Sequence, residues 1–167
     1  MIFFSTIDDD YREAFYSIMC EYLPGSDIDT VKSKETLWHK AFVCCVKDGQ
    51  VIGIAYGWQR PDGISFCLDG IAIVAQFWHM GYGTALLTEF ERAVRDYGAM
   101  RVSLGSAGGY VEDFYISCGY EPTEYKIYDE GVIRSVKAFE GLEDYREYVR
   151  PQGVDGFVVF EKEIGSA

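Results

Sequence analysis

The sequence lacks the cysteine patterns that hold disulfide-rich domains or zinc sites together. Its 167 residues contain five cysteines, which is an odd number, and no two of them form a CxxC pair. We therefore expect neither a disulfide framework nor a metal site. We interpret the cysteines as small buried hydrophobic residues in a reducing compartment.

Long hydrophobic runs are also missing. No uninterrupted apolar stretch approaches the ~20 residues of a membrane span, and no basic segment followed by an apolar run opens the chain. We expect a cytoplasmic protein that does not enter a membrane. Because 49% of the residues are hydrophobic, the chain can bury a sizeable core as one domain.

Basic residues are scarce relative to acidic ones. The chain has 15 Lys and Arg against 27 Asp and Glu, for a net charge of −12, and no basic stripe. Nucleic acid is therefore not an expected partner, because its binding requires cations that neutralise phosphates. The acidic surface is either a solubility device, which we favour, or a means of concentrating a cationic amine.

The sequence also lacks the residue patterns of a hydrolase triad and of the common nucleotide-binding motifs. The two histidines, His39 and His79, have no nearby serine, cysteine or acid in a triad pattern, so hydrolase chemistry is not indicated. The GK[ST] of a P-loop is absent. The dinucleotide motif GxGxxG would need glycine where Leu86 stands.

Hydrophobic periodicity predicts a mixed α/β protein. Strands are expected at 1–5, 41–47, 51–59, 64–74, 100–104, 119–128 and 156–164, and helices at 7–23, 30–42, 84–97 and 109–118. Between the last two strands, residues 129–156 form an insertion far longer than a hairpin loop. It contains an expected helix at 142–149 that Pro151 stops.

The stretch HMGYGTALL, residues 79–87, places two glycines directly before a helix and after a long apolar strand. A glycine turn at a helix N-terminus directs backbone N–H groups and the positive end of the helix dipole at one point. The stretch therefore predicts a phosphate-binding turn.

The segment from Ile64 to Pro122, with IAIVAQFWHMGYG and then EDFYISCGYEP at the right interval, resembles the core of the GNAT superfamily of acetyl-CoA-dependent N-acetyltransferases. The resemblance implies an α/β fold with a central mixed sheet of about seven strands flanked by helices. It implies a single GNAT-like domain over 1–167, with the insertion at about 129–156. It also implies acetyl-CoA as co-substrate and no metal.

The resemblance also implies which residues meet the cofactor. Ile71 and Ile73 would lie beside the pantetheine arm, and the loop would surround the pyrophosphate through His79, Met80, Gly81, Tyr82, Gly83 and Thr84. One position departs from the family pattern, because Trp78 stands where Arg or Gln is usual. We interpret Trp78 as a surface aromatic that covers the loop; the alternative places it near the cofactor. Loss of the cation lowers the expected affinity for the cofactor.

Two residues are candidates for the chemistry. Asp69, placed by strand alternation on one face with Cys67, Ile71 and Ile73, is either the base that takes the amine proton or a turn former beside Gly70. Tyr115 matches the tyrosine of the FY pair that the family uses as a general acid toward the cofactor sulfur. Its alternative is packing of a short helix on the sheet, and we favour the acid.

The sequence as a whole thus predicts an N-acetyltransferase that moves acetyl from acetyl-CoA to a primary amine by direct attack in a ternary complex. The acceptor is either a small molecule or a protein amine. The alternative function is a catalytically weak or inactive GNAT-derived module that binds acyl-CoA or an amine. The insertion is expected to be a substrate lid, with a homodimer contact as the alternative.

Overall fold

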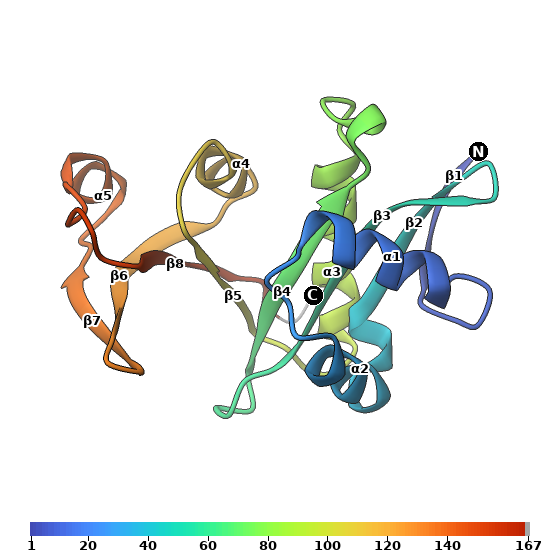
Figure 1. Ribbon diagram of the computed structural model, residues 1–167, viewed down its shortest axis with the longest axis horizontal. Coiled ribbons are helices and arrows are strands. Elements are labelled where there is room, and N and C mark those ends of the chain that lie inside the picture. Colours follow the sequence, from blue (N-terminus) through green and yellow to red (C-terminus); the bar gives the residue numbers. More distant parts are fainter. Residues whose placement is uncertain (166–167) are drawn as a thin grey trace. The chain divides into compact units, whose positions relative to one another are not determined.

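Eight strands, five α-helices and two short 3₁₀ helices make up residues 1–165, the part of the chain that this computed structural model describes (Figure 1). They fall into two compact units, Met1–Val102 with the residues from Ile164 onward, and Ser103–Glu163. The mixed α/β fold class is confirmed. A single domain over the whole chain stays a prediction.

The first unit contains a sheet of four antiparallel strands in the order β1-β2-β3-β4. Their bounds are Ile2–Thr6 for β1, Phe42–Lys47 for β2, Gln50–Gln59 for β3 and Ser65–Ile73 for β4. The β2–β3 hairpin turns through Asp48 and Gly49, whose φ values are 50° and 80°. Two successive positive φ angles match the twist of a two-residue hairpin loop. All four expected strands are confirmed.

Three helices and two 3₁₀ helices complete the first unit. They are α1 (Arg12–Tyr22), α2 (Ile28–Leu37), η1 (His39–Ala41), η2 (Ala75–Phe77) and α3 (Tyr82–Arg95). The helix expected at 30–42 begins earlier and ends at Leu37, after which the chain tightens into η1. Among the described residues, no helix is long and apolar enough to cross a membrane.

Alternation along β3 separates the contacts of α1 from those of α3. Ile54 and Tyr56 belong to the buried cluster that includes Phe15 and Met19 of α1. Gly57 lies instead against the α3 side, where an added Cβ would be 3.1 Å from the Phe90 ring and 1.8 Å from the Cys67 carbonyl oxygen. Glycine is therefore required at position 57, since any side chain would push the helix and β4 away from the strand.

The second unit contains four strands in the order β5-β8-β6-β7 and two short helices. The strands are β5 (Arg101–Ser106), which begins at the end of the first unit, β6 (Glu121–Asp129), β7 (Val132–Ala138) and β8 (Gly156–Glu163). The helices are α4 (Val111–Ser117) and α5 (Leu142–Glu147). β6 pairs antiparallel with both β7 and β8.

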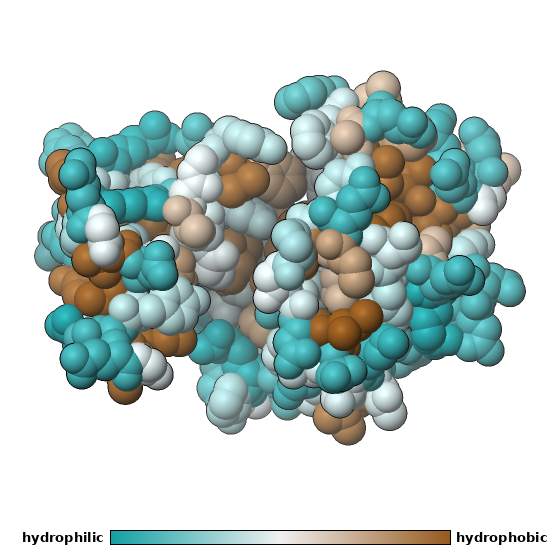
Figure 2. Space-filling model, in the orientation of Figure 1, coloured by the Kyte–Doolittle hydropathy of each residue, from teal (hydrophilic) through white to brown (hydrophobic). Residues whose placement is uncertain are grey.

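Strand β7 is the element that the sequence reading missed. It follows a two-residue turn at Glu130 and Gly131, whose φ values of 50° and 81° are those of a tight hairpin. The insertion therefore consists of an edge strand, the helix α5 and a return segment. Hydrophobic patches lie on the surface of this part of the molecule (Figure 2, left). The exposed large side chains on and around the insertion include Tyr128, Val132, Ile133, Val149 and Val154.

The five cysteines are free thiols, as expected, but their burial is uneven. Cys44 and Cys45 are buried, and burial raises their thiol pKa values to about 12 and about 11. Cys67 and Cys118 are half-buried, and Cys20 is exposed on α1. The expectation that all five are buried is therefore wrong for Cys20, which lies on the outer side of an amphipathic helix.

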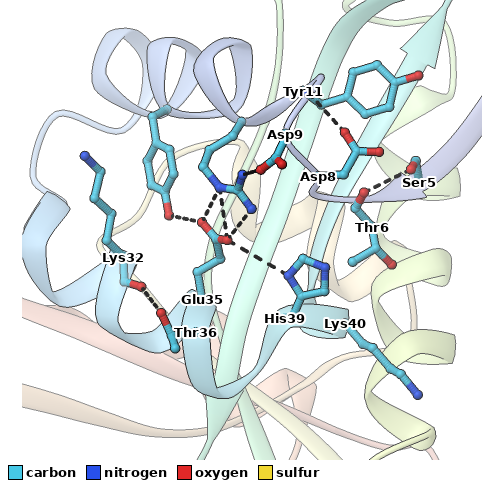
Figure 3. A network of polar contacts seen from close by, with 12 residues as sticks. Ser5, Thr6, Asp8, Asp9, Tyr11, Lys32, Glu35, Thr36, His39 and Lys40 are labelled. Atoms are coloured by element: carbon cyan, nitrogen blue, oxygen red, sulfur yellow. Dashed lines mark hydrogen bonds and ion pairs between the residues drawn. The ribbon is translucent and has the colours of Figure 1, made fainter.

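A buried carboxylate joins α1 to α2. Glu35, which is 9% exposed, accepts hydrogen bonds from the Arg12 guanidinium at 2.9 Å and from the Tyr16 hydroxyl at 2.8 Å (Figure 3). His39 Nδ1 lies 3.9 Å from the same group. Burial favours the neutral acid, but the hydrogen bonds from Arg12 and Tyr16 outweigh it and lower the pKa of Glu35.

We expect Glu35→Gln to destabilise the protein at pH 7 by about 2 kcal/mol, or about 4–8 °C in Tm. Because the folded-state pKa is lowered, this stability is present above the unfolded-state pKa of about 4.3 and is lost as the pH falls below it. The Tm difference between wild type and variant should therefore shrink at acid pH. Thermal unfolding followed by circular dichroism from pH 3 to pH 7 measures it.

The matched control is Glu21→Gln, which removes the same charge from an exposed position on α1. It should leave the pH dependence of Tm close to that of wild type. A Tm difference for Glu35→Gln that stays constant from pH 7 to pH 3 would contradict the assignment.

Candidate functional site

The loop between β4 and α3 holds an unusual backbone path. After η2, His79 adopts a left-handed conformation with φ 64°, and Gly81, the N-cap of α3, has φ 85°. A side chain at position 81 would be strained by this φ, although nothing lies within 4 Å of an added Cβ. The two left-handed residues turn the chain sharply into the helix.

Six consecutive amides of this loop, from residue 79 to residue 84, have no acceptor among residues 1–165. The first turn of α3 contains no acidic residue, and no side chain caps it. The positive end of a 14-residue helix therefore faces outward with its donors free. Such an arrangement binds an anion. His79, Met80, Gly81, Tyr82, Gly83 and Thr84 are thus together in one backbone turn.

The start of the loop is fixed by hydrogen bonds from two side chains. The Trp78 indole Nε1 donates to the Ile73 carbonyl at 2.5 Å, and the Ala75 amide donates to the Tyr22 hydroxyl at 2.9 Å. Trp78 itself is 46% exposed, in agreement with its interpretation as a surface aromatic that covers the loop. It ties the loop to the end of β4 by a neutral hydrogen bond and supplies no positive charge.

A β-bulge lies in β4 at Asp69. Tyr56 pairs with Gly70 and Gly57 pairs with Leu68, so Asp69 is the extra residue without a partner on β3. Bulges interrupt the alternation of side chains. Cys67 pairs with Trp58, whereas Ile71 pairs with Ala55, which lies on the other face of β3.

The expectation that Asp69, Cys67, Ile71 and Ile73 share one face is therefore wrong. Strict alternation holds only on each side of the bulge. Ile71 and Ile73 share a face with each other. That face is the one toward α3, because a Cβ added at Gly53 would lie 2.5 Å from Ile73 Cδ1 and 3.3 Å from Leu86 Cδ2 of α3. Cys67 points to the opposite face.

The surroundings of Asp69 shift its acidity. Although the residue reaches the surface of the unit, the protein packed around its carboxyl group raises the pKa of that group above its ordinary value. Burial raises the pKa of the nearby Tyr56 hydroxyl to about 12, and the charge of Asp69 adds to that rise. Tyr56 Oη lies 2.9 Å from Ser26 Oγ in the α1–α2 loop, so side chains from three segments converge at the bulge.

Tyr115 lies on α4 in the second unit. Its ring contacts those of Phe114, Tyr120 and Phe160, with centroids 5.3–6.2 Å apart. Its hydroxyl has no hydrogen-bond partner among the described residues. Burial raises the pKa of this phenol to about 12. The ring is thus a packing residue, as one interpretation predicted, while the hydroxyl is left free to act as a donor.

Comparison with known proteins agrees with this geometry. The family model described as acetyltransferase (GNAT) family matches residues 5–120, more than half of the chain. The chain belongs to the GNAT acetyltransferase family. It is therefore an acyltransferase. A search of curated proteins finds no sequence that matches.

Solved structures of this family share the fold. The chain is similar to ribosomal-protein-S18-alanine N-acetyltransferase from Escherichia coli, with TM-score 0.70, 16% identity and coverage of 100% of this chain and 96% of that one. It is similar to Arabidopsis thaliana Naa50 in complex with the bisubstrate analogue CoA-Ac-MVNAL, with TM-score 0.69, 12% identity and coverage of 98% of this chain and 99% of that one. It is also similar to the polyamine N-acetyltransferase of Drosophila melanogaster, with TM-score 0.69, 11% identity and coverage of 98% of this chain and 100% of that one.

Sequence analysis named the loop, Asp69 and Tyr115 as candidates but missed side chains that the structure places beside the loop and Asp69. Tyr22, Ser26 and Tyr56 reach the site through hydrogen bonds to residues 30 or more positions away, and sequence spacing does not show such contacts. The bulge had a local signal, because Asp-Gly within an otherwise apolar strand is a recognised place for one. No group of His, Cys, Asp and Glu side chains that could hold a metal occurs among the described residues.

We expect Asp69→Asn to raise Tm at pH 7. A carboxyl group whose folded-state pKa is raised favours folding only when protonated, so it lowers stability as the pH rises from its unfolded value of about 3.9 through the folded-state pKa. The neutral amide does not incur this loss. The Tm advantage of the variant should therefore disappear near pH 3.5, which calorimetry across this pH range would show.

Asp10→Asn removes the same charge from an exposed loop of the first unit and is the control for overall charge. An Asp69→Asn variant less stable than wild type at pH 7 would mean that the carboxylate has a favourable partner, against the environment described above.

Proposed function

We propose that the protein transfers the acetyl group of acetyl-CoA to a primary amine by direct attack in a ternary complex. The observation that supports this most is the run of free amides at the N-terminus of α3 in a chain of the GNAT family. These donors fit a pyrophosphate, which needs several hydrogen bonds and a positive potential. Neighbouring structures of the fold include one in complex with a CoA bisubstrate analogue.

Residues of the first unit would hold the cofactor. The amides of residues 79–84 would bind the pyrophosphate, and Ile71 and Ile73 at the end of β4 would lie beside the pantetheine arm. When bound, acetyl-CoA supplies the thioester from which the acetyl group is taken. Trp78 contributes no charge to the phosphates, so we expect weaker cofactor binding than an arginine at this position would give.

Asp69 is the proposed base. A free alkylammonium has a pKa of about 10.4, so its proton must leave before the nitrogen can attack. A carboxylate with a raised pKa is a better proton acceptor than an ordinary surface carboxylate, and it can act directly or through a water. The alternative role of Asp69, which is to shape the β-bulge, remains open beside this one.

Tyr115 is the proposed hydrogen-bond donor and acid toward the leaving thiolate. With a pKa of about 12, the phenol stays protonated throughout the neutral range. Complete transfer of its proton to a thiolate, whose conjugate acid has a pKa of about 8.5, is less favourable than for an exposed phenol. We therefore assign Tyr115 chiefly the role of a hydrogen-bond donor that stabilises the negative charge developing on the sulfur in the transition state.

The acceptor is either a small-molecule amine or a protein amine. Structures similar to this chain carry the names of a ribosomal-protein alanine acetyltransferase and of a polyamine acetyltransferase, so the fold accommodates both classes. The net charge of −12 would favour a cationic amine over an acidic one. A cytoplasmic location and a dimer stay predictions from the sequence.

The proposal is tested by acetyl-CoA binding together with thiol release on a panel of amines. Acetyl-CoA at 100 times its Kd should stabilise the folded state by about 2.7 kcal/mol, a Tm rise of about 5–10 °C. Gly81→Val should abolish this rise, because a β-branched residue cannot adopt φ 85° without moving the free amides. Thiol release should require an amine.

Gly63→Val is the matched control for Gly81→Val. Gly63 also has a positive φ, of 76°, and also has nothing within 4 Å of an added Cβ, but it lies in the β3–β4 turn. The two variants should lose similar stability, and only Gly81→Val should lose the cofactor shift. Cofactor binding without thiol release on any amine would favour the alternative function, an acyl-CoA-binding module.

Tyr115→Phe should lower kcat by about 10- to 100-fold and leave the Kd for acetyl-CoA within about twofold of wild type. The substitution keeps the ring contacts and removes a donor that matters only as the thiolate leaves. Steady-state kinetics and calorimetric titration measure the two effects. Tyr128→Phe, which also keeps a ring contact with a phenylalanine, is the control. An unchanged rate for a demonstrably rate-limiting chemical step would refute the assignment.

A further inference from the structure

Glu112 is a buried carboxylate in the helix that carries Tyr115. It lies three residues before Tyr115 on α4 and is only 3% exposed. Burying a charged carboxylate costs free energy unless hydrogen bonds or an opposite charge compensate it. The mechanism proposed above gives Glu112 no role, so the burial of a carboxylate in this place needs another explanation.

Both groups that compensate Glu112 come from the insertion. Its Oε1 accepts hydrogen bonds from the Tyr145 hydroxyl on α5 and from the Arg150 guanidinium in the return segment. Arg150 is itself held in place, since its Nη1 donates to the Ala107 carbonyl at 3.3 Å and its guanidinium lies 5.7 Å from the Tyr125 ring centroid. The two hydrogen bonds from the insertion to Glu112 therefore end on the same carboxylate oxygen.

The second oxygen, Oε2, is buried and has no hydrogen-bond partner among the described residues. Nothing else among the described polar groups therefore fixes the orientation of this carboxylate. The helix has little means to fix itself, because α4 is seven residues long and no side chain caps its N-terminus. Besides the packing of the Tyr115 ring, the hydrogen bonds from Tyr145 and Arg150 to Glu112 are thus the contacts that can orient α4.

A second connection leads from the same tyrosine to Tyr115. The Tyr145 ring packs edge-on against Phe160 of β8, with centroids 5.8 Å apart, and Phe160 packs against Tyr115 at 6.2 Å. Tyr145 is therefore connected to Tyr115 by two series of contacts, one through its hydroxyl to Glu112 on the same helix and one through its ring to Phe160. Tyr148 differs, since its ring contacts Tyr125 and Phe139 and not Phe160.

We propose that Glu112 is a positioning residue, which with Tyr145 and Arg150 of the insertion fixes α4 so that the Tyr115 hydroxyl is held in its working position. The insertion is then a brace for the catalytic helix rather than a mobile lid. This inference rests on the proposed role of Tyr115. It also predicts that excision of 132–153, which would remove both donors, damages the site itself.

The decisive experiment is a double-mutant cycle between Tyr145→Phe and Tyr115→Phe. Tyr145→Phe removes the hydroxyl and keeps the ring contact with Phe160. It should lower kcat by about three- to tenfold with the acetyl-CoA Kd unchanged, because a misplaced donor loses much of its effect. In the Tyr115→Phe background it should lower kcat no further. Equal losses in both backgrounds, or no loss in wild type, would overturn the proposal.

Tyr148→Phe is the matched control, and NMR supplies a readout that does not depend on activity. In protein labelled at tyrosine Cζ, Tyr145→Phe and Glu112→Gln should each shift the Tyr115 resonance, whereas Tyr148→Phe should leave it in place. An unmoved Tyr115 resonance would overturn the proposal even if the enzyme were inactive. Conversely, a shifted resonance with full activity of Tyr115→Phe would refute the proposed function of Tyr115 and leave the brace standing.

Discussion

The backbone at the start of α3 leaves its hydrogen-bond donors free, and the rest of the first unit is arranged so that they stay in place. Left-handed residues at positions 79 and 81 turn the chain into the helix. Trp78 ties the loop to β4, and Tyr22 of α1 ties it to the opposite helix layer. An anion site made of amides depends on such external ties, because its own groups are all directed toward the ligand and none is left for self-support.

A neutral side chain, Trp78, stands at the start of the loop where the family pattern has Arg or Gln. An arginine at the start of the loop would attract phosphate from a distance, and the attraction would weaken with salt. The indole hydrogen bond of Trp78 ties the loop to the end of β4 without adding charge. A loop that is held in one conformation before its ligand arrives loses less entropy on binding, and this gain does not weaken with salt.

Much of the fold followed from local patterns, because apolar alternation and the period of α3 reflect burial directly. The glycine turn before α3 was equally accessible, since glycine spacing and a following helix are local features. The bulge at Asp69 and the strand β7 could not be predicted from such local patterns. The first requires knowing which residue of β3 pairs with which residue of β4. The second, β7, has no buried position, so its sequence shows no alternation of buried and exposed residues.

The buried supports of the candidate site were the least predictable part. Nothing in the sequence distinguishes Glu35 and Glu112 from the other acidic residues, and only the folded structure shows Arg12 and Arg150 beside them. Pairs separated by 23 and 38 residues leave no periodic trace in a single sequence. Titratable residues in helices with neighbouring aromatics are the places where such pairs should be sought.

The five thiols differ in solvent exposure, so a thiol-reactive dye can be attached selectively to α1. Cys20 is the exposed one among them, and it lies two residues before Tyr22, whose hydroxyl accepts the hydrogen bond from Ala75 at the start of the loop. A maleimide dye would react first at this position and report on the helix that adjoins the anion loop. The native chain thus carries a labelling site for fluorescence measurements of ligand entry without any engineered cysteine.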